Sequence, residues 1–75
     1  MMDFAVEDFL DTIRSALVVP GGTTPEAGAV RMVITQANAV AVAIAIEAAL
    51  ESGDVEAATD MLCSAMIPGP RREAP

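Results

Sequence analysis

The chain of 75 residues has eleven acidic side chains, four arginines and neither lysine nor histidine, which gives a formal net charge of −7. This length allows a single domain, and an acidic body opposes binding to polyanionic nucleic acid. Cys63 is the only cysteine, so an intrachain disulfide is excluded, and the lack of histidine excludes a Cys/His zinc set.

One apolar stretch dominates the sequence, because residues 39–46 contain no polar side chain. A chain this short buries only about 60–65% of its unfolded surface and is marginally stable alone. Small domains often gain stability from a disulfide, a metal or a partner subunit. Without the first two, self-association is the expected source of stability.

The same stretch is too short for a membrane span, which needs about 20 apolar residues. The N-terminal region carries Glu7 and Asp8, whereas a signal peptide is positively charged there. We therefore expect a soluble, cytoplasmic protein that does not bind membranes.

Residues 3–18 are predicted to form an amphipathic helix. Asp3 is a suitable N-cap, and Pro20 with the following glycine pair ends the helical pattern. Apolar residues recur at spacings of three and four, as a helix requires: these are Val6, Phe9, Leu10, Ile13 and Leu17.

An acidic stripe runs along this helix, formed by Asp3, Glu7 and Asp11 with Asp8 beside it. Carboxylates on adjacent turns can share a hard cation or act as a catalytic pair. No second acidic motif of ligand spacing elsewhere in the chain complements the stripe, so a solvated face is favoured. We expect no metal or cofactor, and treat the four acids as the candidate surface for a basic partner protein.

Residues 25–52 are predicted to form one long helix. Thr24 is a good N-cap, and Pro25 suits the first helical position. The alternation of alanine with Val40, Val42, Ile44 and Ile46 has the period of a strand, and a hairpin over residues 30–46 is the alternative. Helix is favoured, because alanine is the best helix former and is depleted in strands.

The long helix changes its polar side partway along. In its first half, Arg31, Thr35 and Asn38 share one side, opposite an apolar side formed by Val30, Val33, Ala37, Val40 and Ile44. Glu47 and Glu51 then take nearly the other side, so the middle is apolar all round and should be buried. We expect one face to pack on the chain's own helices and the other on a second copy. The predicted interface residues are Val40, Val42, Ile44, Ile46 and Leu50.

A third helix is predicted over residues 54–67, after Gly53 ends the long helix and Asp54 caps the next. Residues 68–75 contain three prolines and read as a disordered tail. The expected architecture is therefore all-α, a helical-bundle homo-oligomer with a single helical domain over residues 1–67.

Function is constrained mainly by what is missing. Without histidine, lysine, tyrosine or tryptophan, most acid–base and nucleophilic chemistry is excluded, so we expect no enzyme. The leading hypothesis is a small acidic interaction module, acting as an adaptor, inhibitor or assembly subunit. The alternatives are a phage-type inhibitor that blocks a basic nucleic-acid-binding surface of a bacterial defence protein, and a small DNA-binding regulator or antitoxin. The last is disfavoured because its recognition helix would carry Glu56 and Asp60 and no basic residue.

Overall fold

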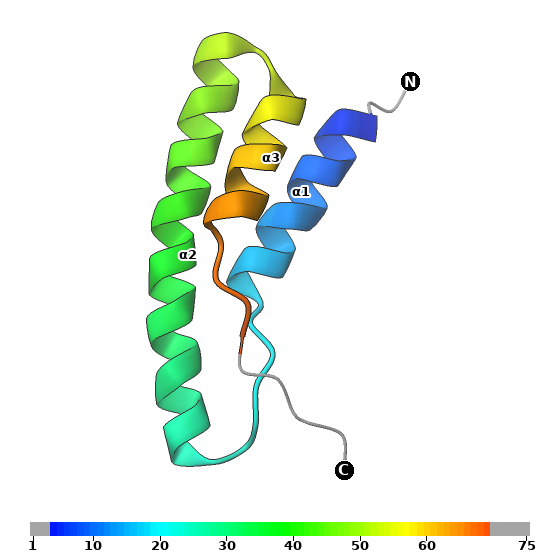
Figure 1. The fold of residues 1–75 in the computed structure, drawn as a ribbon. Helices are drawn as coiled ribbons and strands as arrows, with labels where there is room; N and C mark the ends of the chain where they lie inside the picture. The colour runs from blue at the N-terminus through cyan, green and yellow to red at the C-terminus, as the bar shows by residue number, and fades with distance from the viewer. Residues whose placement is uncertain (1–3, 70–75) are drawn as a thin grey trace.

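The computed structural model describes residues 4–69, which form three α-helices: α1 (Phe4–Leu17), α2 (Pro25–Ser52) and α3 (Val55–Ala65). No strand occurs in this range, so the all-α prediction is confirmed and the hairpin alternative over residues 30–46 is wrong. The two short helices run side by side in the same direction, and α2 runs antiparallel to both and extends beyond them (Figure 1). Asp3 and most of the predicted tail lie outside the described residues.

The ends of α2 and the start of α3 are set by local chemistry. The Thr24 hydroxyl accepts a hydrogen bond from the Ala27 amide at 3.1 Å, as an N-cap side chain does. Gly53 has a φ of 73° and donates its amide to the Ala49 carbonyl, which is the left-handed cap that favours glycine. Asp54 then accepts from the Ala57 amide at 3.0 Å. These three predicted caps are confirmed.

The core between the helices is small. Its buried apolar side chains within residues 4–69 are Phe9, Ala16, Val42, Ala45, Ala58 and Leu62. Half of them are alanines, so little apolar area is removed from water. The predicted apolar stripe of α1 is only partly used: Phe9 is buried and Ile13 packs at the core's edge, whereas Val6, Leu10 and Leu17 stay exposed.

A buried amide ties three segments together. Asn38, in the middle of α2, is only 1% exposed. Its Nδ2 donates to the Ala16 carbonyl at 2.9 Å and to the Ile67 carbonyl at 3.0 Å. Its Oδ1 accepts from the Ile67 amide at 2.7 Å. The end of α1 and the segment after α3 are thereby both fixed to α2, and the polar atoms of Asn38 are satisfied.

The position of Asn38 decides which side of α2 faces inward. Its neighbours on the same side, Arg31 and Thr35, are half-buried, and Arg31 donates to the Gly22 carbonyl at 3.1 Å. Further along, Val42 and Ala45 continue this inner side into the core. The more polar side of the first half of α2 therefore faces the chain's own short helices, and the apolar side faces out.

Candidate functional site: the outer face of α2

The side of α2 that points away from the other helices is exposed and apolar. We call the following twelve exposed residues the outer face: seven large apolar ones (Val30, Met32, Val33, Val40, Ile44, Ile46 and Leu50), four alanines (Ala29, Ala37, Ala39 and Ala43) and Gln36. The exposed fraction of the seven large side chains runs from 37% for Ile46 to 81% for Leu50. Gln36 is its one polar member.

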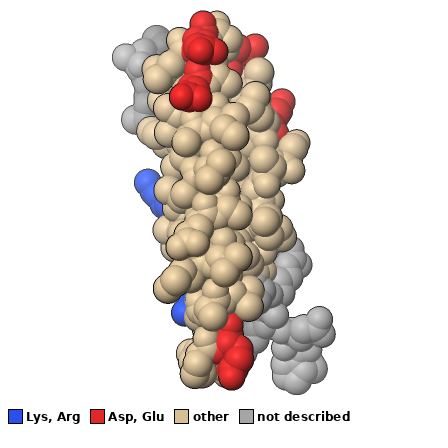
Figure 2. Space-filling model, turned by 90° about the vertical axis from the view of Figure 1, so that its left-hand side faces the viewer, with Lys and Arg blue, Asp and Glu red and all other residues tan. Residues whose placement is uncertain are grey.

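Charge is confined to the ends of the outer face. Residues 32–46 carry no charged side chain, while Glu26 lies near the start of α2 and Glu47 and Glu51 near its end. Figure 2 views this side of the molecule and shows an uncharged central surface between acidic groups at the two ends, with other charged groups only along its edges. An exposed apolar area of this length, bounded by polar residues, is typical of an interaction site.

The energy available from covering this face can be gauged from its exposure. The exposed fractions of the seven large side chains together equal about four fully exposed ones. Fully burying such a side chain contributes about 1.5–3 kcal/mol, so covering the face yields roughly 6–12 kcal/mol per copy. One partner helix covers only part of this face, so the figure is an upper bound on what each copy contributes against the roughly 4–15 kcal/mol that association costs.

By length and composition α2 also qualifies as a membrane span. Its most apolar 18-residue window has a mean hydropathy of 1.7, and 17% of that window is buried in the chain. Its inner side, however, is occupied by hydrogen bonds from Arg31 and Asn38 to other parts of the fold. Only the outer face is therefore open to contact, whether with protein or with lipid.

The structure divides the interface residues named from sequence. Val40, Ile44, Ile46 and Leu50 all lie on the outer face. Val42 does not, because it is buried in the chain's own core and has no surface to offer a second copy. Val33 lies on the outer face although it was not among them. The helical pattern places Val33 opposite Asn38, and this position could have identified it as an outer-face residue.

The candidate acidic surface lies elsewhere, on α1. Glu7, Asp8 and Asp11 are all exposed. Asp11 lies 3.8 Å from Arg14 in a solvent-exposed pair that contributes little to stability. Asp3, the fourth acid of the predicted stripe, lies outside the described residues.

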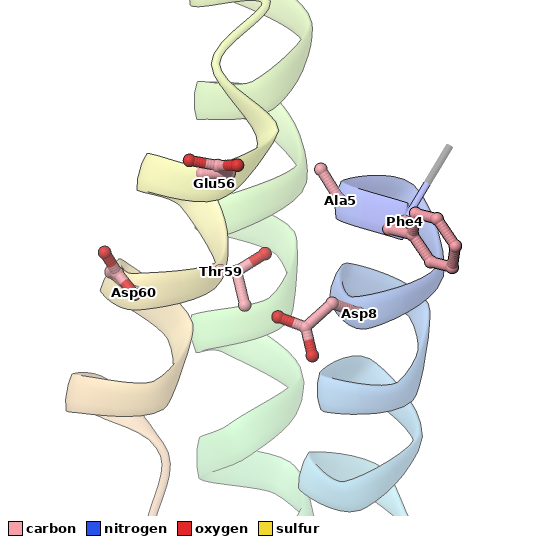
Figure 3. Close-up of a pocket in the computed structure, with 6 residues that line it drawn as sticks. All are labelled: Phe4, Ala5, Asp8, Glu56, Thr59 and Asp60. Carbon is pink, nitrogen blue, oxygen red and sulfur yellow. The ribbon is translucent and has the colours of Figure 1, made fainter. Parts of the chain in front are cut away.

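Asp8 belongs to a pocket of about 410 Å³ between the first two turns of α1 and of α3. Figure 3 shows Asp8 and Thr59 directed toward the space between the helices, with Glu56 and Asp60 on the α3 side. Both helix N-termini lie at this end of the molecule, and their positive dipole ends favour acidic side chains nearby. The part played by α3 in this acidic end was missed from sequence, because helical spacing within one segment does not reveal which helices are neighbours.

The remaining candidates for chemistry within residues 4–69 are clusters of acidic side chains and the Cys63 thiol. No group of three or more Cys, Asp or Glu side chains there is arranged to hold a metal ion. Cys63 is exposed and has no histidine anywhere in the chain to serve as its base. No protein-family model, curated protein or solved structure matches this chain.

Proposed function

We propose that this protein is a small, acidic, non-enzymatic protein–protein interaction module that acts as a helical homo-oligomer. In this role it serves as an adaptor, an inhibitor or an assembly subunit. The observation that carries the proposal is the outer face, which leaves exposed more large apolar side chains than the chain buries in its own core.

We favour self-association as the role of the outer face because the monomer has a small core and no disulfide to stabilise it. Half of the buried apolar side chains in its described core are alanines, and Cys63 has no second cysteine in the chain with which to form a bridge. Isolated domains of this size are marginal, and many are stabilised by a partner subunit. A second copy of the chain is also available as a partner wherever the protein is present.

The test is light scattering coupled to size exclusion, over about a hundredfold range of protein concentration. This range changes the ratio of concentration to Kd by about two decades, so the fraction of chain in the dimer should change measurably. The wild-type chain is expected to elute as a dimer or larger assembly. Val40→Glu, which puts a charge in the outer face where the side chain is 61% exposed, should give a folded monomer. The matched control is Leu10→Glu on α1, at a site 53% exposed, which should leave the assembly intact.

A wild-type chain that stays monomeric across the whole range would refute self-association. Flotation with liposomes of neutral phospholipid then distinguishes the remaining uses of the face. Co-flotation that Val40→Glu abolishes would assign the face to lipid, and a chain that remains in solution would leave a different protein as its partner.

A second candidate function is supported by the acidic end of the molecule. Asp8, Glu56 and Asp60 line one pocket, and Glu7 directly precedes Asp8 in α1 without lining it. Carboxylates so concentrated, in a chain of charge −7, suit a partner with a basic surface. A phage-type inhibitor that covers a basic nucleic-acid-binding surface would work in this way.

The probe for this second function is a fluorescent oligoarginine peptide followed by anisotropy. Binding should weaken steeply as salt rises, and Asp60→Lys should weaken it more than Glu26→Lys, which makes the same charge change away from the pocket. Equal effects of the two variants would show that only net charge matters and would contradict a defined acidic site.

A further inference from the structure

The outer face has a central stripe with a regular spacing. Counted at about 100° per residue, the positions most nearly opposite the buried Asn38 are separated by four, three, four, three and four residues. They are Ala29, Val33, Gln36, Val40, Ala43 and Glu47. This is the spacing by which two helices pack knobs into holes at a shallow crossing angle.

We propose that the partner on this stripe is a second copy of the chain whose α2 runs antiparallel, with the two-fold axis near the level of Asn38. The proposal rests on the self-association proposed above and adds the orientation and register of the pair. In this register Val33 meets Ala43 of the partner subunit, and Val40 meets Gln36 of the partner subunit. Each valine of the stripe is thus placed against a residue that is not β-branched.

The size pattern is what makes the stripe self-complementary. An isologous interface must match its own surface after a two-fold rotation. Reversing the order of the stripe brings Val33 opposite Ala43 and Glu47 opposite Ala29, so a large side chain meets a small one in these layers. Val40 meets Gln36, which is larger but unbranched at Cβ. A parallel, in-register pair would instead set Ala29 against Ala29 and Ala43 against Ala43, leaving two under-filled layers at the interface.

Charge favours the same orientation. In a parallel pair each Glu47 would face the partner's Glu47 at the end of the stripe, and like charges at such a position are unfavourable. In the antiparallel register Glu47 meets Ala29 of the partner subunit instead, and the helix dipoles are opposed. What remains is a repulsion at each end, because Glu26 of one copy lies within about one helical turn of both Glu47 and Glu51 of the other.

This residual repulsion provides the test, since all three acids are exposed. In an antiparallel pair, Glu47→Lys puts a lysine near Glu26 of the partner at both ends and should tighten the dimer about tenfold in Kd, measured by sedimentation equilibrium at low salt. In a parallel pair it would place lysine against lysine and give no such gain. Glu56→Lys on α3 makes the same change in net charge away from the stripe and is the matched control.

The triple variant Glu26→Lys, Glu47→Lys, Glu51→Lys restores like charges at both ends and should lose the gain of Glu47→Lys over its control. A dimer in which Glu47→Lys binds no more tightly than Glu56→Lys overturns the antiparallel register while leaving self-association standing. A wild-type chain and variants that are all monomeric overturn both.

A distance measurement checks the orientation independently of charge. A nitroxide is attached at Leu50→Cys in a Cys63→Ser background, because Cys63 is exposed and would also react. Pulsed electron paramagnetic resonance should give a separation of about 35 Å between labels on the two copies of an antiparallel pair, from the rise per residue along both helices. A separation near 10–15 Å, set by the distance between helix axes, would show a parallel pair and refute the proposal.

Discussion

Replacing Asn38 with alanine should destabilise the fold more than any other single truncation of a polar side chain in α2. The change removes the partners of the Ala16 carbonyl and of both backbone groups of Ile67. A buried polar group left without a partner costs about 1–3 kcal/mol. The segment after α3 can partly detach and regain water, so the expected loss is about 2–4 kcal/mol rather than the full sum.

A loss of this size is large for so small a protein, whose free energy of unfolding is roughly 4–11 kcal/mol by the usual value per residue. The assay is urea unfolding followed by circular dichroism, at one fixed protein concentration so that self-association contributes equally to every variant. Ser64→Ala, at an exposed position on α3, is the control and should change stability by less than about 0.5 kcal/mol.

Hydrogen exchange locates the effect. The amide of Ile67 donates to Asn38 in the native fold, so its protection should fall in Asn38→Ala while amides in the middle of α2 remain protected. Unchanged protection of Ile67, or a loss of stability no greater than that of Ser64→Ala, would refute the view that this amide fixes the C-terminal segment.

Three further substitutions test the helix ends and the segment after α3. Gly53→Ala should lower the free energy of unfolding by about 1–2 kcal/mol in thermal unfolding, because φ is 73° and this left-handed conformation is strained for alanine. The new methyl group itself would have nothing within 4 Å, so the strain is the only expected cost. An unchanged stability would contradict the role of Gly53 as the cap. Asp54→Ala should cost about 1 kcal/mol through loss of the bond to the Ala57 amide, and Asp54→Asn should recover most of it. Gly69→Ala should cost about 1–3 kcal/mol, since its methyl group would overlap the Pro20 carbonyl; wild-type stability in urea would show that this contact is absent in solution.

The positions of the helices could be predicted because short-range interactions determine where each helix begins and ends. Thr24 and Pro25 start α2, Gly53 ends it, and Asp54 starts α3. Each depends on hydrogen bonds or backbone angles within a few residues. The competing hairpin signal, a period-two alternation of valine or isoleucine with alanine, was overridden by the helix preference of alanine.

The direction in which α2 faces could not be predicted, because a helical pattern gives only the relative angles of its side chains. Hydrophobicity alone would turn Val33 and Val40 inward and Asn38 outward. The fold does the opposite, since Asn38 satisfies backbone groups at the ends of two other segments. Those acceptors lie 22 and 29 residues away in the chain, and no local rule identifies them.

Prediction of the candidate site is limited in the same way, because the sequence does not show which side of α2 faces inward. Four of the five interface residues named from sequence are exposed on α2, because any large apolar residue outside the inner side must lie there. Val42 differs from them only in its angle about the helix axis. In α1, Leu10 and Leu17 fit a core-facing stripe but stay exposed, because the core has room for only part of it.

The connections between the helices are unequal, and this has a consequence for the order of folding. Only Gly53 and Asp54 separate α2 from α3, whereas residues 18–24 join α1 to α2. Closing the shorter loop costs less chain entropy, so the helical hairpin of α2 and α3 should form in the transition state, with α1 docking afterwards. In stopped-flow experiments, Leu62→Ala should then slow refolding, while Phe9→Ala should mainly speed unfolding. Because Asn38 donates to the Ala16 carbonyl at the end of α1, that hydrogen bond would form only after the transition state. It would be the last of the Asn38 hydrogen bonds to form, and it helps to keep the folded chain from opening.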